Sequence, residues 1–221
     1  MSGGRPGVPD SGLAARLRLM VLTDPSPACG RGLATVVAEC LDAGATAIQL
    51  RDKNATAREL FETALELIPE VRARQALLVV NDRFDVALAA GADGAHLGPK
   101  DLPVEDVRTR VPSEFLIGFS VDNPSRARQA AEDGADYLGV GAVFGTTSKP
   151  GLEFEAIGPE RVGEVLTAAR LPGVGIGGIT PANAAKVARV GAGVAVLGAV
   201  MHSPDPAQAV ADLVRVIESE S

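Results

Sequence analysis

The sequence contains few aromatic side chains: they make up 3% of its 221 residues, and tryptophan is absent. A core without large rings must be packed from Ala, Val, Leu and Gly, and 46% of the residues are hydrophobic. Small apolar side chains suit closely packed layers of helices and strands. The composition therefore predicts a folded chain with a substantial core.

Cysteine is equally scarce, since Cys29 and Cys40 are the two in the chain. They form no CxxC motif, and two thiols make no disulfide framework. Long hydrophobic runs are also missing, and none approaches the ~20 residues that a membrane-spanning helix needs. Reduced thiols and the lack of a spanning segment predict a cytoplasmic protein.

The sequence also has no excess of positive charge, because its formal net charge is −7. An acidic chain is a poor general surface for nucleic acid or for anionic membranes. A local basic pocket for a small anion remains compatible with this balance.

The chain divides into a short tail and one long repeating region. Residues 1–16, "MSGGRPGVPDSGLAAR", are rich in Gly, Pro and Ser and lack the apolar stretch of a signal peptide. We expect them to form a flexible N-terminal tail. Residues 17–221 are expected to form one catalytic domain without an internal boundary.

In this domain, short apolar runs alternate with Ala-rich amphipathic segments. The expected strands cover 17–24, 46–52, 76–82, 94–98, 115–120, 136–144, 173–179 and 193–199. The clearest expected helices cover 56–75, 124–134, 181–191 and 204–219. Several helical stretches end in Gly-Ala, which fits the positive φ of a helix C-terminal glycine. These glycines are Gly44, Gly91, Gly134 and Gly191.

Near-continuous apolar strands that alternate with helices indicate an α/β fold with a parallel sheet covered by helices. An open doubly wound sheet would also fit this pattern. Eight such units in about 200 residues favour a single-domain (β/α)8 TIM barrel. In that fold, functional residues lie at the carboxyl ends of the strands.

Two cations and an amide lie at the end of the second expected strand. Gln49, Arg51 and Lys53 alternate along the chain and so share one face of it. Such a set suits a polyanion such as a diphosphate. The alternative is a solvated strand end with a surface ion pair.

Acidic residues follow the third and fourth strands. Asp82, which stands beside Asn81, and Asp101 belong to neighbouring strand ends. Mg²⁺ commonly binds one or two carboxylates together with substrate phosphate oxygens. Asp101 could instead cap the helix that starts in "DLPVED". His96 fits a core histidine with satisfied ring nitrogens, and with no second His nearby we do not assign it to the metal.

Two loops have the character of phosphate sites. The loop after the sixth strand places three hydroxyls beside a cation, at Thr146, Thr147, Ser148 and Lys149. It could also be an ordinary Gly/Ser/Thr loop. Gly177 and Gly178 expose backbone amides before a helix, where barrels often hold a phosphate between the seventh and eighth strands.

Together these features suggest two anionic ligands, one of them a Mg²⁺-diphosphate, and transfer from a diphosphate leaving group. No Ser-His-Asp set and no Cys-His pair supplies a nucleophile.

The motifs "IQLRDK", "VNDRFDVALAAGADGAHLG", "KDLP", "ADYLGVGAVFGTTSKPG" and "IGGITPANAAKV" resemble those of the thiamine-phosphate synthase family. The resemblance covers roughly residues 17 to 212. It implies a transferase that condenses hydroxymethylpyrimidine diphosphate with a thiazole phosphate, giving thiamine phosphate and diphosphate. The implied mechanism is a Mg²⁺-assisted dissociative substitution, and the implied assembly is a homodimer.

The resemblance also implies which residues meet each ligand. For the pyrimidine diphosphate they are Gln49, Arg51, Lys53, Asn81, Ser120 and Lys149. For the thiazole phosphate they are Thr146, Thr147, Ser148, Gly178, Leu197 and Gly198. The implied Mg²⁺ ligands are Asp82 and Asp101, and the implied catalytic residues are Ser120 and Lys149.

Some positions depart from the family pattern. Pro99 stands where Gln is common, Asp122 follows a strand after which a His is frequent, and Gly198 replaces a frequent Ser. The turn "GAGV" before the eighth strand is one residue shorter than expected. These changes bear on substrate affinity more than on reaction class. The alternatives are a thiazole tautomerase-like isomerase, which would use that His, and a non-catalytic paralogue that binds a phosphorylated ligand.

Overall fold

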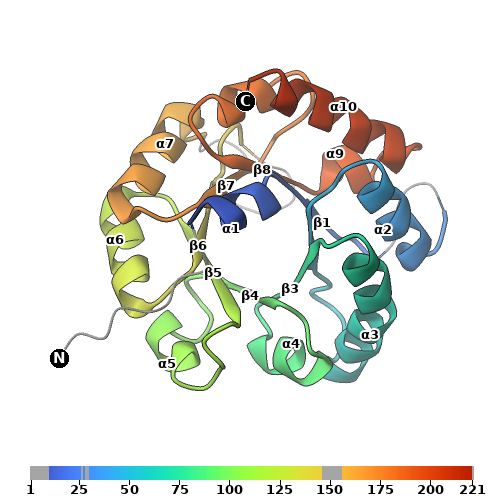
Figure 1. Cartoon of the computed structure of the whole chain (residues 1–221), viewed down its shortest axis with the longest axis horizontal. Coiled ribbons are helices and arrows are strands. Elements are labelled where there is room, and N and C mark those ends of the chain that lie inside the picture. The colour runs from blue at the N-terminus through green and yellow to red at the C-terminus, as the bar shows by residue number, and fades with distance from the viewer. Residues whose placement is uncertain (1–9, 26, 28–29, 146–155, 221) are drawn as a thin grey trace.

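The strands of the molecule are short, buried and arranged in a ring. A computed structural model describes residues 10–25, 27, 30–145 and 156–220. Its eight strands pair in parallel in the order of the sequence, and β1 also pairs with β8, which closes the barrel (Figure 1). The strands are β1 (Leu19–Leu22), β2 (Ala47–Leu50), β3 (Leu77–Asn81), β4 (Gly94–Leu97), β5 (Leu116–Val121), β6 (Tyr137–Gly141), β7 (Gly173–Ile176) and β8 (Gly193–Val196).

Helices surround this ring, and the first of them lies across one of its ends (Figure 1). They are α1 (Asp10–Arg16), α2 (Leu33–Asp42), α3 (Ala57–Ala73), α4 (Phe84–Ala90), α5 (Val104–Arg108), α6 (Pro124–Asp133), α7 (Gly158–Ala169), α8 (Ala184–Ala188), α9 (Gly198–Met201) and α10 (Pro206–Glu218). The expected (β/α)8 barrel is confirmed, and the open doubly wound sheet is wrong because β1 and β8 are hydrogen-bonded neighbours.

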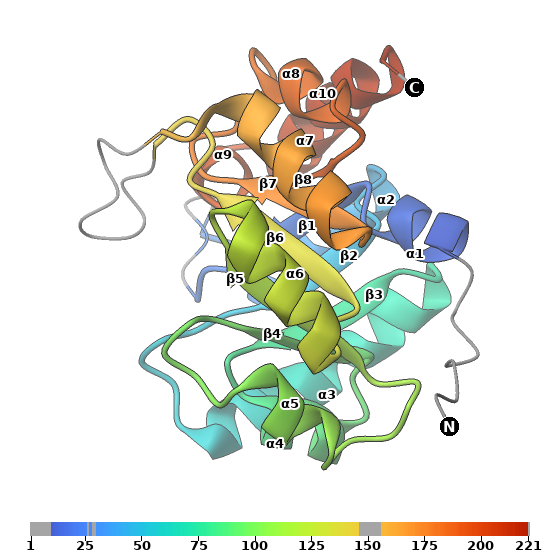
Figure 2. The ribbon, with the colours of Figure 1, turned by 90° about the vertical axis from the view of Figure 1, so that its left-hand side faces the viewer.

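Helix α1 differs from the tail that the sequence led us to expect. Residues 10–16 are helical, and Leu13 is buried with Leu17 against the interior of the barrel. Arg16 donates a hydrogen bond to the carbonyl of Ala76, just before β3. Figure 2 shows α1 at the end of the barrel at which the strands begin. A short amphipathic segment behind Gly and Pro residues gave no signal strong enough to separate it from a tail.

Two hydrophobic layers hold the barrel together. Successive strand residues point to opposite faces: Met20 belongs to the interior cluster, and Val21 belongs to the layer between strands and helices. Helix α3 shows the helical counterpart, because Leu60, Ala64 and Leu67 are all buried against the strands. Burial of such side chains contributes roughly 1.5–3 kcal/mol each.

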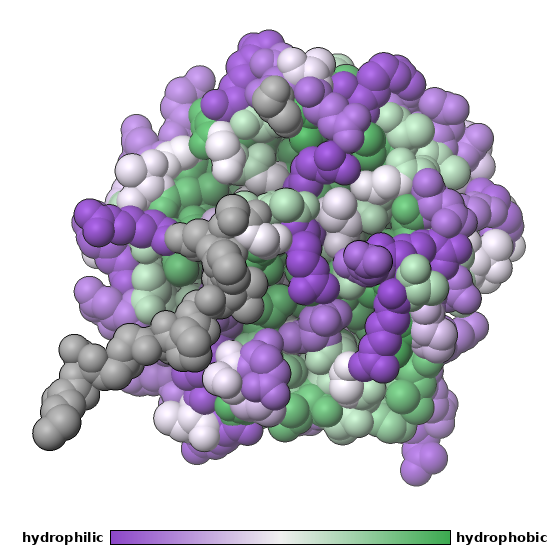
Figure 3. All heavy atoms as spheres, in the orientation of Figure 1, coloured by the Kyte–Doolittle hydropathy of each residue, from purple (hydrophilic) through white to green (hydrophobic). Residues whose placement is uncertain are grey.

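The outer faces of the helices are polar. Hydrophilic side chains lie around the periphery of the molecule (Figure 3). In the ranges that the structure describes, the large apolar side chains that are exposed are Leu65, Leu88 and Leu102. Within the same ranges, no helix combines the length and the apolar composition needed to cross a bilayer.

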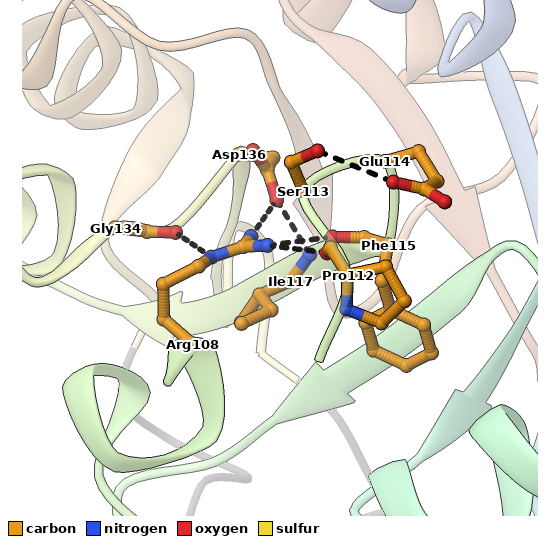
Figure 4. A network of polar contacts seen from close by, with 8 residues as sticks. All are labelled: Arg108, Pro112, Ser113, Glu114, Phe115, Ile117, Gly134 and Asp136. Carbon is orange, nitrogen blue, oxygen red and sulfur yellow. Dashed lines mark hydrogen bonds and ion pairs between the residues drawn. The ribbon is translucent and has the colours of Figure 1, made fainter. Parts of the chain in front are cut away.

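An ion-pair network lies at the end of the barrel where β5 and β6 begin (Figure 4). The guanidinium of Arg108 pairs with Asp136 and donates to the carbonyls of Gly134 at 3.2 Å and Phe115 at 2.9 Å. The same carboxylate accepts the backbone N–H of Ile117 at 2.8 Å. This polar cluster ties three backbone segments together at the end opposite to the strand C-termini.

Candidate functional site

A cavity of about 410 Å³ opens at the carboxyl ends of the strands. It is lined by residues of β1, β5, β6, β7 and β8, by residues of the segments after β2, β4, β5, β6, β7 and β8, and by Arg126 of α6. Five of the residues expected at the site line it: Arg51, Ser120, Gly178, Leu197 and Gly198. The barrel therefore brings together residues that lie far apart in the sequence.

The segment that carries Arg51 is held by a threonine of the neighbouring strand. The hydroxyl of Thr23 accepts the backbone N–H of Arg51 at 2.8 Å and donates to its carbonyl at 3.2 Å. Gln49, two residues before Arg51, is buried, and its amide lies 3.5 Å from the sulfur of Met20. Gln49 and the exposed Lys53 are not among the residues that line the cavity.

Asp82 occupies an unusual backbone conformation at the end of β3. Its φ is +63°, in the left-handed region that Asp tolerates better than most residues. Its N–H donates to the carbonyl of His96 at 2.8 Å, so the pairing of β3 with β4 continues past Asn81. The chain turns sharply there, which places Asp82 beside the end of β4.

Asp101 closes the turn that follows β4. Its Oδ2 accepts the N–H of Gly98 at 2.6 Å, and its own N–H donates to the carbonyl of Gly98. The N-cap of α5 is Pro103, without a side-chain hydrogen bond. The alternative reading of Asp101 as a helix cap is therefore wrong.

The two acids follow neighbouring strands, and two carboxylates fit the way Mg²⁺ is usually held in proteins. Neither acid is among the residues that line the cavity. Across the described part of the chain, no group of three or more His, Cys, Asp and Glu side chains could hold a metal. Any Mg²⁺ there would need ligands from the substrate or from water as well.

Ser120 lines the cavity, and its hydroxyl contacts a histidine. His96 Nε2 lies 3.0 Å from Ser120 Oγ, and His96 Nδ1 lies 3.2 Å from the hydroxyl of Tyr137. The interpretation of His96 as a core histidine with both ring nitrogens satisfied is confirmed. Complete burial raises the pKa of Tyr137, and the negative charge of Asp136 adds to the effect.

The turn after β7 exposes its backbone to the cavity. Gly177 and Gly178 both have positive φ, at +103° and +66°. The side chain of Asn183 accepts the N–H of Thr180 at 2.8 Å and donates to the carbonyl of Gly178 at 3.0 Å, which fixes the turn. A side chain at Gly178 would clash, since a Cβ would lie 2.5 Å from the carbonyl oxygen of Gly145.

Leu197 and Gly198 start the short helix α9 directly after β8. The first N–H groups of a helix have no partner inside it, so they point outward at its start. Leu197 and Gly198 line the same cavity as the turn at Gly178.

Arg126 is a cavity residue that sequence reasoning missed. It lies in the first turn of α6, and its guanidinium is 3.9 Å from the carboxylate of Asp122, which also lines the cavity. The cap of α6 is Asn123, whose side chain accepts the N–H of Arg126 at 3.0 Å, so Asp122 does not cap the helix. An Arg three residues after an N-cap at this end of the barrel is the signal that would have pointed to it.

The predicted loop residues after β6 lie outside the described residues. They are Thr146, Thr147, Ser148 and Lys149. The last described residue before them, Gly145, lies against Gly178.

Comparison with known proteins identifies relatives along almost the whole barrel. Residues 19–200 match the family model described as thiamine monophosphate synthase. The chain is 46% identical over 200 residues to a thiamine-phosphate synthase of Natronomonas pharaonis, covering 90% of this chain and 94% of that protein. It is 48% identical over 187 residues to one of Roseiflexus castenholzii, covering 84% and 82%.

A solved structure is similar in fold as well as in sequence. The thiamine phosphate pyrophosphorylase from Pyrococcus furiosus superimposes with a TM-score of 0.85 at 40% identity. The match covers 94% of this chain and 98% of that structure.

Proposed function

Because the chain belongs to the thiamine monophosphate synthase family, we propose that it joins hydroxymethylpyrimidine diphosphate to a thiazole phosphate and releases diphosphate. The observation that carries this proposal is the cavity. It unites Arg51 and Ser120, which we expect at the diphosphate, with Gly178, Leu197 and Gly198, which we expect at the thiazole phosphate. Its volume, about 410 Å³, suits small ligands.

At the diphosphate end, Arg51 supplies a cation on the cavity wall. Its guanidinium can bind two phosphate oxygens at once, and the clamp from Thr23 keeps its backbone in place. The proposal adds Gln49, Lys53, Asn81 and Lys149 as further contacts to the pyrimidine diphosphate.

Asp82 and Asp101 would hold Mg²⁺ beside this end. When bound, the ion would neutralise charge that develops on the departing diphosphate. The oxygen of Asp101 that accepts the Gly98 N–H fixes the carboxylate in one orientation. A ligand oriented in this way is ready to bind a metal without reorganising.

At the other end, backbone amides would hold the thiazole phosphate. The turn at Gly178 and the start of α9 both offer N–H groups, which are good hydrogen-bond donors to an anion. The hydroxyls of Thr146, Thr147 and Ser148 complete this subsite in the proposal.

The reaction breaks the C–O bond between the pyrimidine methylene and the diphosphate, and the electron pair stays on the diphosphate oxygen. The lone pair of the thiazole nitrogen then forms the new C–N bond. Arg51, Ser120 and Lys149 stabilise the leaving charge. The apolar wall that includes Leu22 and Ile176 orients the rings and limits access of water.

The direct test is incubation of the purified protein with both substrates and Mg²⁺, followed by detection of thiamine phosphate and diphosphate. Thiamine phosphate formed in proportion to enzyme supports the proposal. Isomerisation of the thiazole substrate without condensation would favour the tautomerase, although the segment Ser120–Asn123 supplies no His. Binding of thiazole phosphate without either reaction would favour the non-catalytic paralogue.

The proposed function also implies small phosphorylated substrates, a cytoplasmic location and a homodimer for this chain. Light scattering of the purified protein tests the homodimer, and a monomer active at assay concentrations would remove it from the proposal.

A further inference from the structure

Three polar side chains form a line through the interior of the barrel. Tyr137 is fully buried on β6, His96 is 8% exposed on β4, and Ser120 lies on β5 between these two strands. The phenol hydroxyl lies 3.2 Å from His96 Nδ1, and His96 Nε2 lies 3.0 Å from Ser120 Oγ. The line runs from the closed core to the cavity, because Ser120 lines the cavity wall.

Two glycines make the space that this line occupies. A Cβ on Gly118 would lie 2.2 Å from Tyr137 Cζ and 2.5 Å from His96 Nδ1. A Cβ on Gly139 would lie 2.8 Å from His96 Cε1. Strands β5 and β6 thus carry no side chain at the two positions where one would displace the imidazole or the phenol. The arrangement is built into the barrel rather than a chance contact.

The positions of the protons follow from the burial of the phenol. A buried hydroxyl needs an acceptor for its hydrogen, and the partner that the described residues offer Tyr137 is His96 Nδ1. Burial also raises the pKa of Tyr137, so the phenol keeps its proton. If the phenol donates to Nδ1, that nitrogen carries no proton, and a neutral imidazole then has its proton on Nε2.

We propose that Tyr137 and His96 are positioning residues that direct the hydroxyl proton of Ser120 into the cavity, toward an oxygen of the departing diphosphate. Tyr137 donates to His96 Nδ1, His96 Nε2 donates to Ser120 Oγ, and the Ser120 hydroxyl is left to donate outward. In the opposite arrangement Ser120 would donate to His96 and turn its lone pairs toward an anion. The destination of the Ser120 proton rests on the proposed function, whereas the state of His96 does not.

The state of His96 can be measured without any substrate. The sequence contains two histidines, His96 and His202. A long-range proton–nitrogen correlation spectrum of protein labelled with ¹⁵N-histidine reports which ring nitrogen carries the proton, and the His202→Gln variant assigns the signals. We expect His96 with its proton on Nε2 alone. A proton on Nδ1 alone, or on both nitrogens at neutral pH, overturns the proposal.

Tyr137→Phe tests the origin of this state. Phe fills the same space but removes the hydroxyl, so the preference of His96 for the Nε2 proton should weaken or disappear in the same spectrum. A spectrum of the variant that still shows the Nε2 proton alone would mean that Tyr137 does not set the state of the ring.

Two substitutions of His96 separate positioning from packing. In His96→Gln, the amide nitrogen reaches the place of Nε2 and can still donate to Ser120. In His96→Asn, the shorter amide stays near Nδ1 and loses that donor. We expect kcat of His96→Asn to fall on the order of tenfold, as for one hydrogen bond to a charged group, and His96→Gln to keep most of the activity. Equal losses in two folded variants overturn the proposal.

A double-mutant comparison asks whether His96 acts through Ser120. In a Ser120→Ala background, His96→Asn should cost no further activity, because the hydroxyl that it orients is gone. Additive losses would overturn the proposal. If the wild-type protein forms no thiamine phosphate, the proposed function fails, and binding of inorganic diphosphate with Mg²⁺ replaces kcat as the readout. Weaker diphosphate binding by His96→Asn than by His96→Gln supports the proposal, and equal binding overturns it.

Discussion

At the level of single residues, Asp101 has a structural role and a proposed role at the metal, and the two depend on different properties of its side chain. One oxygen accepts the N–H of Gly98 and so shapes the turn after β4. The negative charge is what a Mg²⁺ ion would use. An amide at the same position keeps an oxygen acceptor but loses the charge, which separates the two tasks.

We expect Asp101→Asn to fold normally and to lose Mg²⁺-dependent turnover by roughly a hundredfold, which corresponds to about 2.7 kcal/mol of transition-state stabilisation. Asp101→Ala should lose the same activity and some stability as well, because the Gly98 N–H then has no acceptor. Activity is measured across a Mg²⁺ titration, and stability by urea unfolding. Normal turnover in Asp101→Asn would remove this residue from the metal site.

Gly178 is a cavity residue at which the missing side chain matters for the proposed phosphate subsite. Its φ of +66° is strained for other residues, and a Cβ would lie 2.5 Å from the Gly145 carbonyl oxygen. Gly191 has a similar φ of +77°, but a Cβ there would meet nothing within 4 Å. The pair therefore separates backbone strain from steric conflict at the cavity.

We expect Gly178→Ala to raise the KM for the thiazole phosphate by more than about tenfold, because moving the turn displaces its amides from the anion. Gly191→Ala should cost on the order of 1 kcal/mol in stability from strain alone and leave KM unchanged. Steady-state kinetics and thermal unfolding of both variants provide the comparison. Equal KM values in the two variants would argue against a phosphate at this turn.

At the level of elements, the even-numbered strands share a pattern of glycine and hydrogen bonding at their start. Glycines with positive φ precede β2, β4, β6 and β8, as their place after helices predicted. Two residues later, a side chain accepts an N–H from the first or second residue of the previous strand: Thr46 from Leu19, Asp93 from Leu78, and Asp136 from Ile117. The corresponding position at the start of β8 is Gly193, where a Cβ would lie 2.0 Å from the Leu17 carbonyl oxygen.

The start of α3 is a second local device, a complete capping box. The hydroxyl of Thr56 accepts the N–H of Glu59 at 3.3 Å, and the Glu59 carboxylate accepts the N–H of Thr56 at 2.7 Å. These hydrogen bonds satisfy N–H groups that a helix leaves without partners at its first turn.

Thr56→Ala should lower the free energy of unfolding by about 1 kcal/mol. Thr63→Ala is the matched control in the same helix, since Thr63 donates to the Glu59 carbonyl within the helix and caps nothing. We expect its effect to stay within about 0.5 kcal/mol. Equal unfolding midpoints in urea for the two variants would show that the cap contributes nothing measurable.

The strands could be predicted from sequence because each is a buried apolar run. The expected strand 46–52 overlaps β2 (Ala47–Leu50) but runs past it, since the polar residues that follow the strand were counted with it. The cap of α6 could not be predicted, because Asp122 and Asn123 are both good caps and backbone angles decide between them.

Contacts across several strands were beyond sequence reasoning for a different reason. Arg51 was predicted because it stands at the end of an expected strand, at the rim where barrels bind ligands, whereas Ser120 was predicted from the family resemblance; both line the cavity. The line from Tyr137 through His96 depends on the register of β4, β5 and β6, which single residues do not reveal. Arg126 lies on a helix rather than a strand end, so a search of strand ends missed it.

At the level of the whole molecule, surface carboxylates tie stability to pH. Five of them have pKa values lowered by hydrogen bonds in the folded protein, in four cases chiefly to an arginine and for Glu59 chiefly to the Thr56 N–H: Asp42, Glu59, Asp85, Asp212 and Glu220. The ordinary pKa values are 3.8 for Asp and 4.5 for Glu. A carboxylate with a lowered pKa stabilises the folded state at pH values above its ordinary pKa, and this contribution is lost as the pH falls through the pKa of the folded state.

We expect the urea midpoint to fall when the pH is lowered from about 5 to about 3, and to fall less in high salt, because exposed pairs are screened. Unfolding curves at several pH values and two salt concentrations give the measurement. A midpoint that rises on acidification would contradict the lowered pKa values.

The features expected to serve catalysis and stability lie at opposite ends of the barrel. The cavity lies at the carboxyl ends of the strands, and the Arg108–Asp136 network lies at the opposite end (Figure 4). The side chains of this pair are 13% and 20% exposed, so most of the arginine is withdrawn from water. Removal of the carboxylate charge would take the anionic oxygen of Asp136 away from a partly buried cation.

We therefore expect Asp136→Asn to lower the free energy of unfolding by about 2 kcal/mol, within the range for hydrogen bonds to charged groups. Its kcat should stay unchanged below the unfolding transition, because the network lies at the other end of the barrel and burial, the larger cause of the raised Tyr137 pKa, still keeps the phenol protonated. Glu164→Gln breaks the exposed Arg161–Glu164 pair and is the control, with an expected loss within about 0.5 kcal/mol. A loss of turnover in Asp136→Asn without a loss of stability would show that the two ends of the barrel are coupled.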